Sequence, residues 1–293
     1  MSAAAKNYNP NAQFEIKVWD VDFLKTAKRQ LKARIYQPQH TNGTGPFPVL
    51  LDLHGGAWNN KDRLANVPMD EAAARSGLLV VAIDMSLAPE AAYPACVQEA
   101  SYGVRWVKAK CNEWNGDNQT LGILGSSSGG HVAQLLGMKP NEPLYNAIDL
   151  PGAPGINSRV GYVATRSPIS DPFARFKQAE KMKREHMIKN STTFFNPWET
   201  IHQANPQEWL DRGEKVEMPP MLIMQGGADD NVIPAIQEKF SVSYRAKGGD
   251  CEMTVFENCP HEWIAKPGPD TDRAHAMLKA FIAKQLHAGR IAV

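Results

Sequence analysis

Apolar runs of strand length alternate with segments of helical period along most of the chain, a pattern typical of an α/β sheet. Strands are predicted at residues 14–21, 31–36, 49–53, 78–85, 120–124, 160–164, 221–224 and 253–256. Helices are predicted at residues 68–76, 94–111, 129–136, 236–244 and 274–286, and a loop rich in Pro, Asn, Thr and Gly at residues 37–45. In residues 94–111, apolar residues recur at three- and four-residue steps from Val97 to Val107, as on a helix that covers a sheet. We therefore expect a mostly parallel sheet of about eight strands flanked by helices.

One region, residues 167–219, breaks this alternation. It contains predicted helices at residues 175–188 and 206–212 but no convincing strand. Its aromatic residues are Phe173, Phe176, Phe194, Phe195, Trp198 and Trp209. An insertion of about fifty residues is too long for a simple connection, which predicts a cap or lid. The basic run at residues 177–189 also contains Glu180 and Glu185, so we interpret it as a solvated helix face rather than a polyanion site.

Length and composition restrict the class of protein. The 293 residues, 43% of them hydrophobic, are enough for one large domain or two ordinary ones. Lys and Arg number 32 and Asp and Glu 31, and the formal net charge of +1 argues against nucleic-acid binding through a general basic surface. No apolar run approaches the roughly 18 residues that span a bilayer, and residues 1–11 read as a polar arm without the apolar segment of a secretory signal. We expect a cytoplasmic protein with no membrane partner.

The four cysteines, Cys96, Cys111, Cys251 and Cys259, are sparse for this length. None of them forms a C-x-x-C pair, so the sequence indicates neither a disulfide framework nor a zinc ribbon. Buried free thiols are expected.

The strongest chemical motif is Gly-Ser-Ser-Ser-Gly-Gly at residues 125–130, placed where a predicted strand gives way to a predicted helix. This is G-x-S-x-G in the strand-to-helix context of a nucleophile elbow. The turn is so tight that glycine is needed at both flanks, and the central serine is left with its Oγ exposed. Ser127 is therefore the candidate nucleophile. A lone match could still be a Gly- and Ser-rich turn and nothing more, so the rest of the sequence has to decide.

A second motif, His-Gly-Gly-Ala-Trp at residues 54–58, follows directly on the predicted strand 49–53. Successive glycines let backbone N–H groups turn toward one point, where they can hold the negative oxygen of a tetrahedral intermediate. We assign the N–H groups of Gly55 and Gly56 to an oxyanion hole, with the N–H of Ser128 as a further donor. Alone, this motif could be only a turn that ends a strand.

A serine hydroxyl is a poor nucleophile at neutral pH, so a base must take its proton and a carboxylate must orient that base. With a nucleophile elbow, the expected chain order is serine, acid, histidine. Asp229 follows the predicted strand 221–224, and His261 follows the predicted strand 253–256. Both lie just beyond the carboxyl ends of strands, the edge where open α/β sheets place their sites. Asp229 and His261 are therefore the candidate acid and base.

Other aspartates and histidines of the chain fit these two roles less well. Asp230 could be the acid if the loop register differs by one, whereas Asp84 precedes the nucleophile and fits the chain order badly. The remaining histidines lie in predicted helices, in the insertion, in a loop or near the tail, and these are His131, His275, His186, His202, His40 and His287. None combines a loop position with a preceding late strand as His261 does.

Together these segments resemble the α/β-hydrolase esterases, closest to the hormone-sensitive-lipase-like family and the related feruloyl and acetyl-xylan esterase-like (BD-FAE-like) enzymes. The resemblance runs from about residue 49 to the C-terminus and includes Leu-Ala-Pro-Glu at residues 87–90, Tyr93-Pro94 and Gly-Gly-Ala-Asp at residues 226–229. Two features depart from the family pattern. Asp84-Met85-Ser86 stands where Asp-Tyr-Arg is usual, and the elbow carries Ser126 and Ser128 where Asp or His and Ala are commoner.

The residues and the resemblance together predict an α/β-hydrolase fold in a single domain of residues 1–293, with a cap at residues 167–219. The predicted function is that of a serine carboxylesterase, which hydrolyses small or aromatic carboxylic esters through an acyl-enzyme intermediate and needs no metal or organic cofactor. Two alternatives stay open. One is an amide hydrolase with the same triad, similar to an aryl formamidase or a small exopeptidase, and the other is a non-catalytic binding protein on this fold. The sequence does not specify the natural substrate. It is compatible with a monomer or a homo-oligomer.

Overall fold

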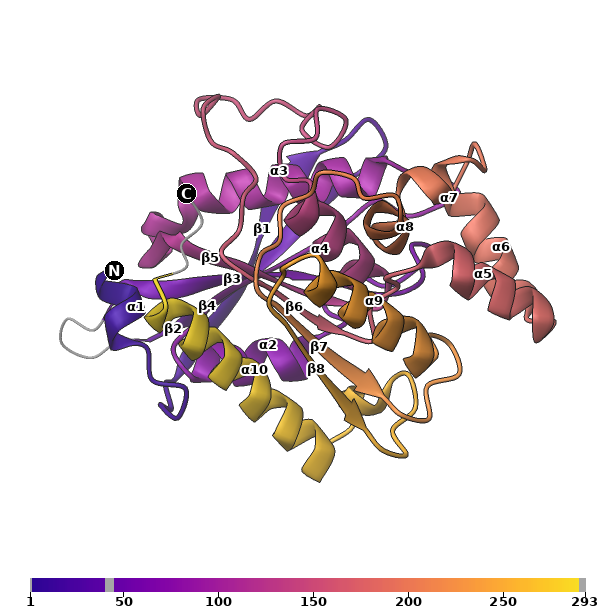
Figure 1. The fold of residues 1–293 in the computed structure, drawn as a ribbon. Coiled ribbons are helices and arrows are strands. Elements are labelled where there is room, and N and C mark those ends of the chain that lie inside the picture. The colour runs from indigo at the N-terminus through magenta and orange to yellow at the C-terminus, as the bar shows by residue number, and fades with distance from the viewer. Residues whose placement is uncertain (1, 40–44, 290–293) are drawn as a thin grey trace.

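The computed structural model describes residues 2–39 and 45–289. Its centre is one eight-stranded sheet with the strand order β1-β2-β4-β3-β5-β6-β7-β8 (Figure 1). The strands are β1 (Ile16–Lys25), β2 (Gln30–Pro38), β3 (Phe47–Leu53), β4 (Leu79–Ile83), β5 (Gly116–Ser126), β6 (Val163–Arg166), β7 (Met221–Gly226) and β8 (Cys251–Phe256). β1 and β2 pair antiparallel, β2 pairs antiparallel with β4, and every pairing from β4 to β8 is parallel. The predicted α/β fold with a mostly parallel sheet is confirmed.

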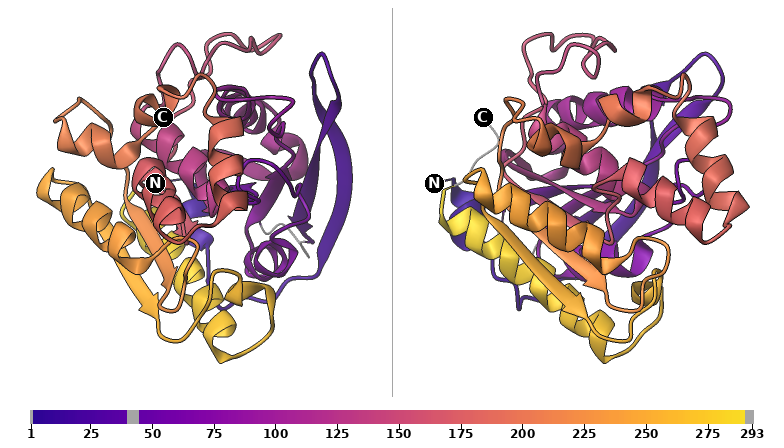
Figure 2. Two further views of the ribbon diagram at one scale, coloured as in Figure 1. Left: turned by 90° about the vertical axis from the view of Figure 1, so that its right-hand side faces the viewer. Right: turned by 45° about the vertical axis from the view of Figure 1, so that its right-hand side comes forward.

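Helices cover both faces of this sheet, because successive side chains of a strand point to opposite sides (Figures 1 and 2). Leu51 and Ile123 belong to the core beneath α3 (Ala95–Lys110), α4 (Ser128–Met138) and α9 (Pro234–Ala246). Their neighbours Leu50 and Leu124 belong to the core beneath α2 (Val67–Arg75) and α10 (Pro269–His287). Strands buried on both faces explain the continuous apolar runs of the sequence.

Residues 167–219 form four helices, α5 (Pro172–Lys181), α6 (Glu185–Phe194), α7 (Thr200–Gln203) and α8 (Pro206–Asp211). In Figure 1, α5 and α6 stand out from the sheet at the right. The single helix predicted at residues 175–188 is wrong, because Lys183 has a φ of 54°, a left-handed conformation that interrupts a right-handed helix. The polar pattern of the sequence does not show this break.

Two other expectations need correction. Residues 1–11 were expected to be a polar arm, but α1 (Ala3–Asn7) forms there with the Ser2 Oγ accepting from the Ala5 N–H, and its Ala4 and Ala5 are buried. The strand predicted at residues 160–164 lies at Val163–Arg166 instead. Thr165 and Arg166 are polar and so fall outside an apolar run, yet they are buried at the end of a central strand. Of the loop predicted at residues 37–45, residues 40–44 lie outside the described residues.

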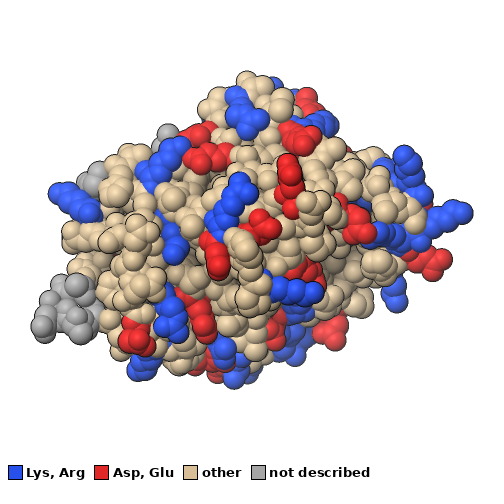
Figure 3. All heavy atoms as spheres, turned by 90° about the horizontal axis from the view of Figure 1, so that it is seen from below, with Lys and Arg blue, Asp and Glu red and all other residues tan. Residues whose placement is uncertain are grey.

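All four cysteines are buried and unpaired, as expected. None of the helices in residues 2–39 and 45–289 is long and apolar enough to cross a membrane. On the face seen in Figure 3, basic and acidic side chains are interspersed, in keeping with a formal net charge of +1.

Candidate active site

Ser127 stands in a sharp turn between β5 and α4. Its φ of 53° lies in the left-handed region that few residues other than glycine adopt. The turn is crowded, because a Cβ on Gly125 would lie 2.5 Å from the Gly129 carbonyl oxygen and one on Gly129 would lie 2.1 Å from the Leu53 carbonyl oxygen. The Ser127 N–H donates to the Arg166 carbonyl oxygen at 2.9 Å. This conformation is the elbow that the sequence predicts.

The structure brings the three candidate triad residues into contact although more than a hundred residues separate Ser127 from His261. The Oγ of Ser127 lies 2.9 Å from Nε2 of His261, and Nδ1 of His261 lies 2.7 Å from Oδ2 of Asp229. A proton on Nδ1 satisfies the carboxylate and leaves Nε2 free to accept from the serine hydroxyl. Ser127 and Asp229 are 6% and 3% exposed, whereas the His261 side chain between them is 14% exposed.

Backbone and side-chain donors hold Asp229 as a carboxylate. Its Oδ1 accepts from the N–H groups of Asn231 and Val232 at 2.9 and 2.8 Å, and its Oδ2 accepts from Gln225 Nε2 at 3.2 Å. Burial alone would raise the pKa of Asp229, but the hydrogen bond and charge of His261, the Val232 N–H and the Ser167 hydroxyl bring it below the ordinary value. The acid is therefore ionised and fixed in direction.

Two contacts hold the loop that carries His261 after β8. The buried Arg166 guanidinium donates through Nη1 to the His261 carbonyl oxygen, and Glu262 pairs with Lys61 at 2.5 Å. Arg166 therefore binds both the elbow, through its carbonyl oxygen, and the histidine loop, through its side chain. Sequence reasoning missed Arg166, although a charged residue just after a predicted buried strand is a signal that could have found it.

The proposed oxyanion turn lies against the elbow. A Cβ on Gly55 would lie 3.3 Å from the Cβ of Ser127. Gly56 has a φ of 105°, and a Cβ there would lie 2.0 Å from the Asn60 carbonyl oxygen, so only glycine fits. In the described part of the chain, the hydrogen bonds of turns, loops and caps use none of the N–H groups of Gly55, Gly56 and Ser128. These three donors are free to bind an oxyanion.

His54 orients this turn, a role that sequence reasoning did not assign to it. Its Nδ1 lies 2.7 Å from the Gly55 carbonyl oxygen, and its Nε2 accepts from the Met85 N–H at 3.3 Å. Burial lowers the pKa of His54, which keeps the imidazole neutral and suits one donor and one acceptor nitrogen. Because the Gly55 carbonyl and the Gly56 N–H belong to one planar peptide group, holding the first fixes the direction of the second.

The alternative acids lie elsewhere. The exposed carboxylate of Asp230 pairs with Arg184. Asp84 accepts from the Lys32 N–H and the Arg63 N–H, and its carboxylate pairs with the Arg63 guanidinium at 3.3 Å. Neither carboxylate is hydrogen-bonded to His261, which leaves Asp229 as the candidate acid.

The other histidines have structural surroundings. His131 is buried in α4 with Nε2 2.7 Å from the Ala204 carbonyl oxygen, and His202 pairs with Glu208 at 2.8 Å. Three more lie within helices, His186 in α6 and His275 and His287 in α10, and His40 lies outside the described residues. Only His261, of the histidines in residues 2–39 and 45–289, contacts the elbow serine.

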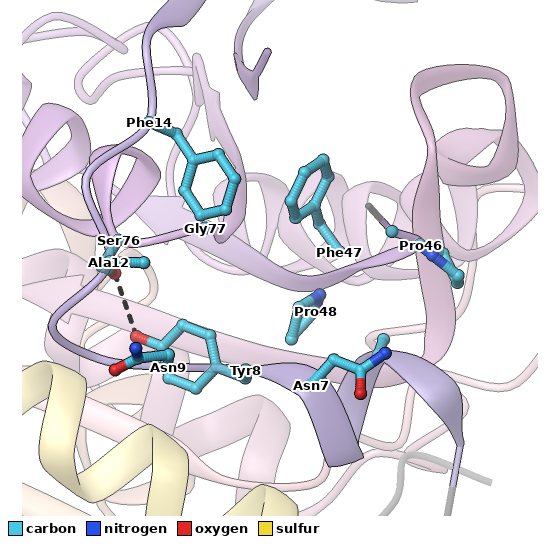
Figure 4. A pocket seen from close by; sticks show the side chains of 12 residues that line it. Asn7, Tyr8, Asn9, Ala12, Phe14, Pro46, Phe47, Pro48, Ser76 and Gly77 are labelled. Carbon is cyan, nitrogen blue, oxygen red and sulfur yellow. Dashed lines mark hydrogen bonds between the residues drawn. The ribbon is translucent and has the colours of Figure 1, made fainter. Parts of the chain in front are cut away.

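A cavity of about 370 Å³ lies between the N-terminal segment and the start of β3, at the end of that strand opposite the oxyanion turn (Figure 4). Phe14 and Phe47 point into it, and the Tyr8 hydroxyl is hydrogen-bonded to Ser76 at its rim. Phe47 begins β3, whereas the oxyanion turn follows the end of that strand, so the cavity is remote from the triad. Within residues 2–39 and 45–289, no group of His, Cys, Asp and Glu could hold a metal ion.

Comparison with known proteins gives the same fold. The BD-FAE family model matches residues 34–243, more than half of the chain. The chain is 26% identical to "Probable carboxylic ester hydrolase LipM" of Mycobacterium tuberculosis over 67% of its own length and 44% of LipM. It is 27% identical to "Esterase LipC" of the same organism over 84% of its length and 60% of LipC. The chain thus spans about half the length of these relatives.

A solved structure of a thermophilic esterase of Thermogutta terrifontis, Est2 with propionate bound, superposes with a TM-score of 0.69. The alignment covers 96% of each chain at 21% sequence identity. At this identity the likeness establishes a shared fold.

Proposed function

The chain belongs to the BD-FAE family, and from that membership and the site geometry we propose that it is a serine carboxylesterase of the α/β-hydrolase fold. The observation that carries the proposal is the continuous hydrogen-bond chain from Ser127 Oγ through His261 to Asp229, at 2.9 and 2.7 Å. The relatives LipM and LipC, which are named as a carboxylic ester hydrolase and an esterase, support this activity. The substrate is a small or aromatic carboxylic ester.

In the first half of the reaction, Ser127 Oγ attacks the ester carbonyl carbon while His261 Nε2 takes the hydroxyl proton. The carbonyl oxygen becomes an oxyanion, and the N–H groups of Gly55, Gly56 and Ser128 stabilise it. Asp229 keeps His261 in the required tautomer and stabilises the imidazolium. Collapse of the intermediate breaks the bond to the alcohol, which receives the proton from His261 and leaves an acyl-serine.

In the second half, a water molecule replaces the alcohol. His261 Nε2 takes a proton from the water, the hydroxide attacks the acyl carbon, and the same N–H groups hold the second oxyanion. Collapse returns the proton to Ser127 Oγ and releases the carboxylic acid. Every proton in this cycle moves through one histidine, so the chain's own residues complete the reaction.

Residues 167–219 act as a cap over this site. Phe194 of α6 stacks on Trp58, the last residue of the His-Gly-Gly-Ala-Trp motif, with ring centroids 4.6 Å apart, and Phe195 packs edge-on against the same ring at 5.2 Å. On the other side, Arg184 pairs with Asp230, the neighbour of the triad acid. The insertion therefore spans from the oxyanion turn to the acid loop, and its aromatic side chains favour apolar or aromatic substrate groups.

A cytoplasmic location is also part of the proposal. Its support is that all four cysteines are buried and unpaired, which suits a compartment that keeps thiols reduced. Separating cell fractions and probing each for the protein tests it, and recovery outside the cytoplasm would overturn it.

Replacement of Ser127 tests the proposed activity. Ser127→Ala removes the nucleophile, so hydrolysis of p-nitrophenyl butyrate should fall by at least about 10⁴-fold, and labelling by a fluorophosphonate probe should be lost. Ser126→Ala is the matched control, because Ser126 is the adjacent buried serine and its Oγ has no hydrogen-bond partner among the described residues. Turnover and labelling of the Ser127 variant at the level of the control would disprove the mechanism. Running anilides and N-formyl compounds beside the esters separates an esterase from an amide hydrolase.

A further inference from the structure

Arg175 is a buried cation within the cap. It lies in α5 and is 1% exposed. Its Nε and Nη2 both donate to Asn231 Oδ1, at 3.1 and 2.7 Å. Two donors on one acceptor fix the plane of the guanidinium, because the five N–H groups of arginine form a rigid fork. The direction of its third nitrogen, Nη1, is therefore fixed as well.

In the described part of the chain, the Arg175 guanidinium forms no ion pair with a carboxylate, and its contacts are the Asn231 side chain and the face of the Trp58 ring. The one acid that acts on it at a distance is Asp229, which already accepts from His261 and from two backbone N–H groups. Burial lowers the pKa of Arg175 to about 10, so the group is still protonated at neutral pH. An unpaired buried charge is costly, and such a charge is commonly retained where it meets a ligand.

Two buried donors beside each other lack acceptors. Neither Nη1 of Arg175 nor Nε1 of the Trp58 indole has a hydrogen-bond partner among the described residues. The Arg175 guanidinium carbon lies 5.9 Å from the centre of the Trp58 ring, and Trp58 is 4% exposed. A carboxylate has two oxygens, so it can accept from both of these donor groups.

These donors lie next to the reacting residues. The backbone N–H of Trp58 donates to Ser128 Oγ at 3.2 Å, and Ser128 follows the nucleophile in the chain. Asn231, which holds Arg175, donates its own N–H to Asp229 at 2.9 Å. Arg175 therefore contacts both the turn that carries Trp58 and the acid loop that carries Asn231.

We propose that Arg175 and the indole N–H of Trp58 form a subsite for a carboxylate on the substrate, so that the enzyme prefers anionic esters to neutral esters of the same shape. The inference rests on the proposed esterase function. The carboxylate belongs either to the acyl group or to the alcohol part of the ester. In both cases the scissile carbonyl can lie at Ser127. An ester that carries it contributes a charge-assisted hydrogen bond to a buried arginine, which is worth about 10- to 100-fold in kcat/KM.

Two substrate pairs measure this preference. p-Nitrophenyl hemisuccinate is compared with p-nitrophenyl 4-methylpentanoate, which replaces the acyl carboxylate by an isopropyl group of similar shape. 4-Acetoxybenzoate is compared with 4-methylphenyl acetate, which replaces the carboxylate of the alcohol part by a methyl group. The readout is the ratio of kcat/KM for the anionic ester to that for the neutral ester, and the pair with the higher ratio shows which part of the substrate carries the carboxylate.

The variants are Arg175→Gln, which removes the charge, and Arg175→Lys, which keeps the charge and loses the fork. Arg175→Gln should lower the ratio about 10- to 100-fold and Arg175→Lys by less. Arg184→Gln is the matched control, because Arg184 is an arginine of the same insertion that pairs outward with Asp230, and it should leave the ratio within about twofold.

The outcomes separate this inference from the proposed function. An unchanged ratio in Arg175→Gln, with both rates lowered equally, would show that Arg175 only supports the acid loop, and would overturn the inference. Wild-type ratios near one for both pairs would overturn it as well. Failure of the proposed function would give a different result. Ser127→Ala would then hydrolyse the neutral esters at the wild-type rate.

Discussion

Gly56 lies at a φ of 105°, and a Cβ there would lie 2.0 Å from the Asn60 carbonyl oxygen. Gly56→Ala must therefore shift the turn and carry the adjacent N–H donors away from the oxyanion. We expect kcat to fall about 10²- to 10³-fold, the loss typical of a missing oxyanion donor, with a smaller change in KM. Steady-state kinetics on p-nitrophenyl butyrate measures both constants.

Gly155→Ala is the control for this change. Gly155 has no heavy atom within 4 Å of its would-be Cβ and no left-handed φ, so alanine fits there without strain. Its kcat should stay near the wild-type value. A Gly56→Ala enzyme as active as the Gly155→Ala enzyme would remove the turn at residues 54–58 from the mechanism.

At the residue scale, the sequence predicts that the side chains of the three candidate triad residues meet. Their order along the chain and their positions after predicted strands are enough for this prediction. Ser127, Asp229 and His261 each follow the carboxyl end of a parallel strand. The carboxyl ends of parallel strands lie at the same edge of the sheet. The contacts of Arg166 and His54 could not be predicted in the same way. They depend on the direction of side chains and carbonyl groups across the fold, and no spacing in the sequence encodes that.

At the scale of elements, the cap shows what periodicity can and cannot predict. Its helical content follows from the pattern of apolar residues, but the break between α5 and α6 depends on the left-handed backbone of one polar residue, Lys183. The same break turns α6 back so that its last residue, Phe194, reaches Trp58. The apolar contact at the end of α6 therefore joins the proposed cap to the turn that follows β3.

Phe194→Ala tests this anchor. Phe194 is fully buried, stacks on Trp58 at 4.6 Å, and packs on Phe195 with centroids 4.8 Å apart. Removing its ring leaves a cavity, and we expect a loss of about 3–5 kcal/mol in the free energy of unfolding, together with a higher KM because the cap is less firmly held. Urea denaturation and steady-state kinetics measure the two effects.

Val242→Ala provides the comparison, because Val242 is a large apolar side chain that is 59% exposed on α9. Its loss should change the free energy of unfolding by no more than about 0.5 kcal/mol. If Phe194→Ala proved as stable as this variant, with KM unaltered, Phe194 would not anchor the cap.

At the scale of the whole molecule, one sheet joins distant parts of the chain. β5, β7 and β8 carry the candidate nucleophile, acid and base, and β6 lies between the first two and supplies Arg166. Alternating strands and helices predicted this parallel arrangement, because right-handed connections leave few other ways to order such elements. The strand predicted at residues 14–21 corresponds to β1, whereas α1 was not predicted, because a helix of five residues is too short to show a helical period.

Two buried carboxyl groups, those of Asp52 in β3 and Asp70 in α2, take no part in the proposed reaction. Asp70 is fully buried, and neither of its oxygens has a partner among the described residues. Burial raises the pKa of Asp70 well above its ordinary value, with a further rise from nearby Asp52, and burial raises the pKa of Asp52 to about 7. Both groups are therefore protonated in the folded protein at pH values where they are ionised in the unfolded chain.

The stability of the whole molecule should accordingly depend on pH. Between about pH 4, where an unfolded Asp ionises, and pH 7 and above, the folded state binds more protons than the unfolded state, so the free energy of unfolding falls as the pH rises. Asp70→Asn keeps the shape without the titration, and we expect a shallower fall between pH 5 and pH 8 and a gain in stability at pH 8. Urea denaturation at a series of pH values measures this slope. Glu257→Gln, which changes an exposed carboxylate, should keep the wild-type slope, and an equally steep fall in Asp70→Asn would show that Asp70 does not take up a proton on folding.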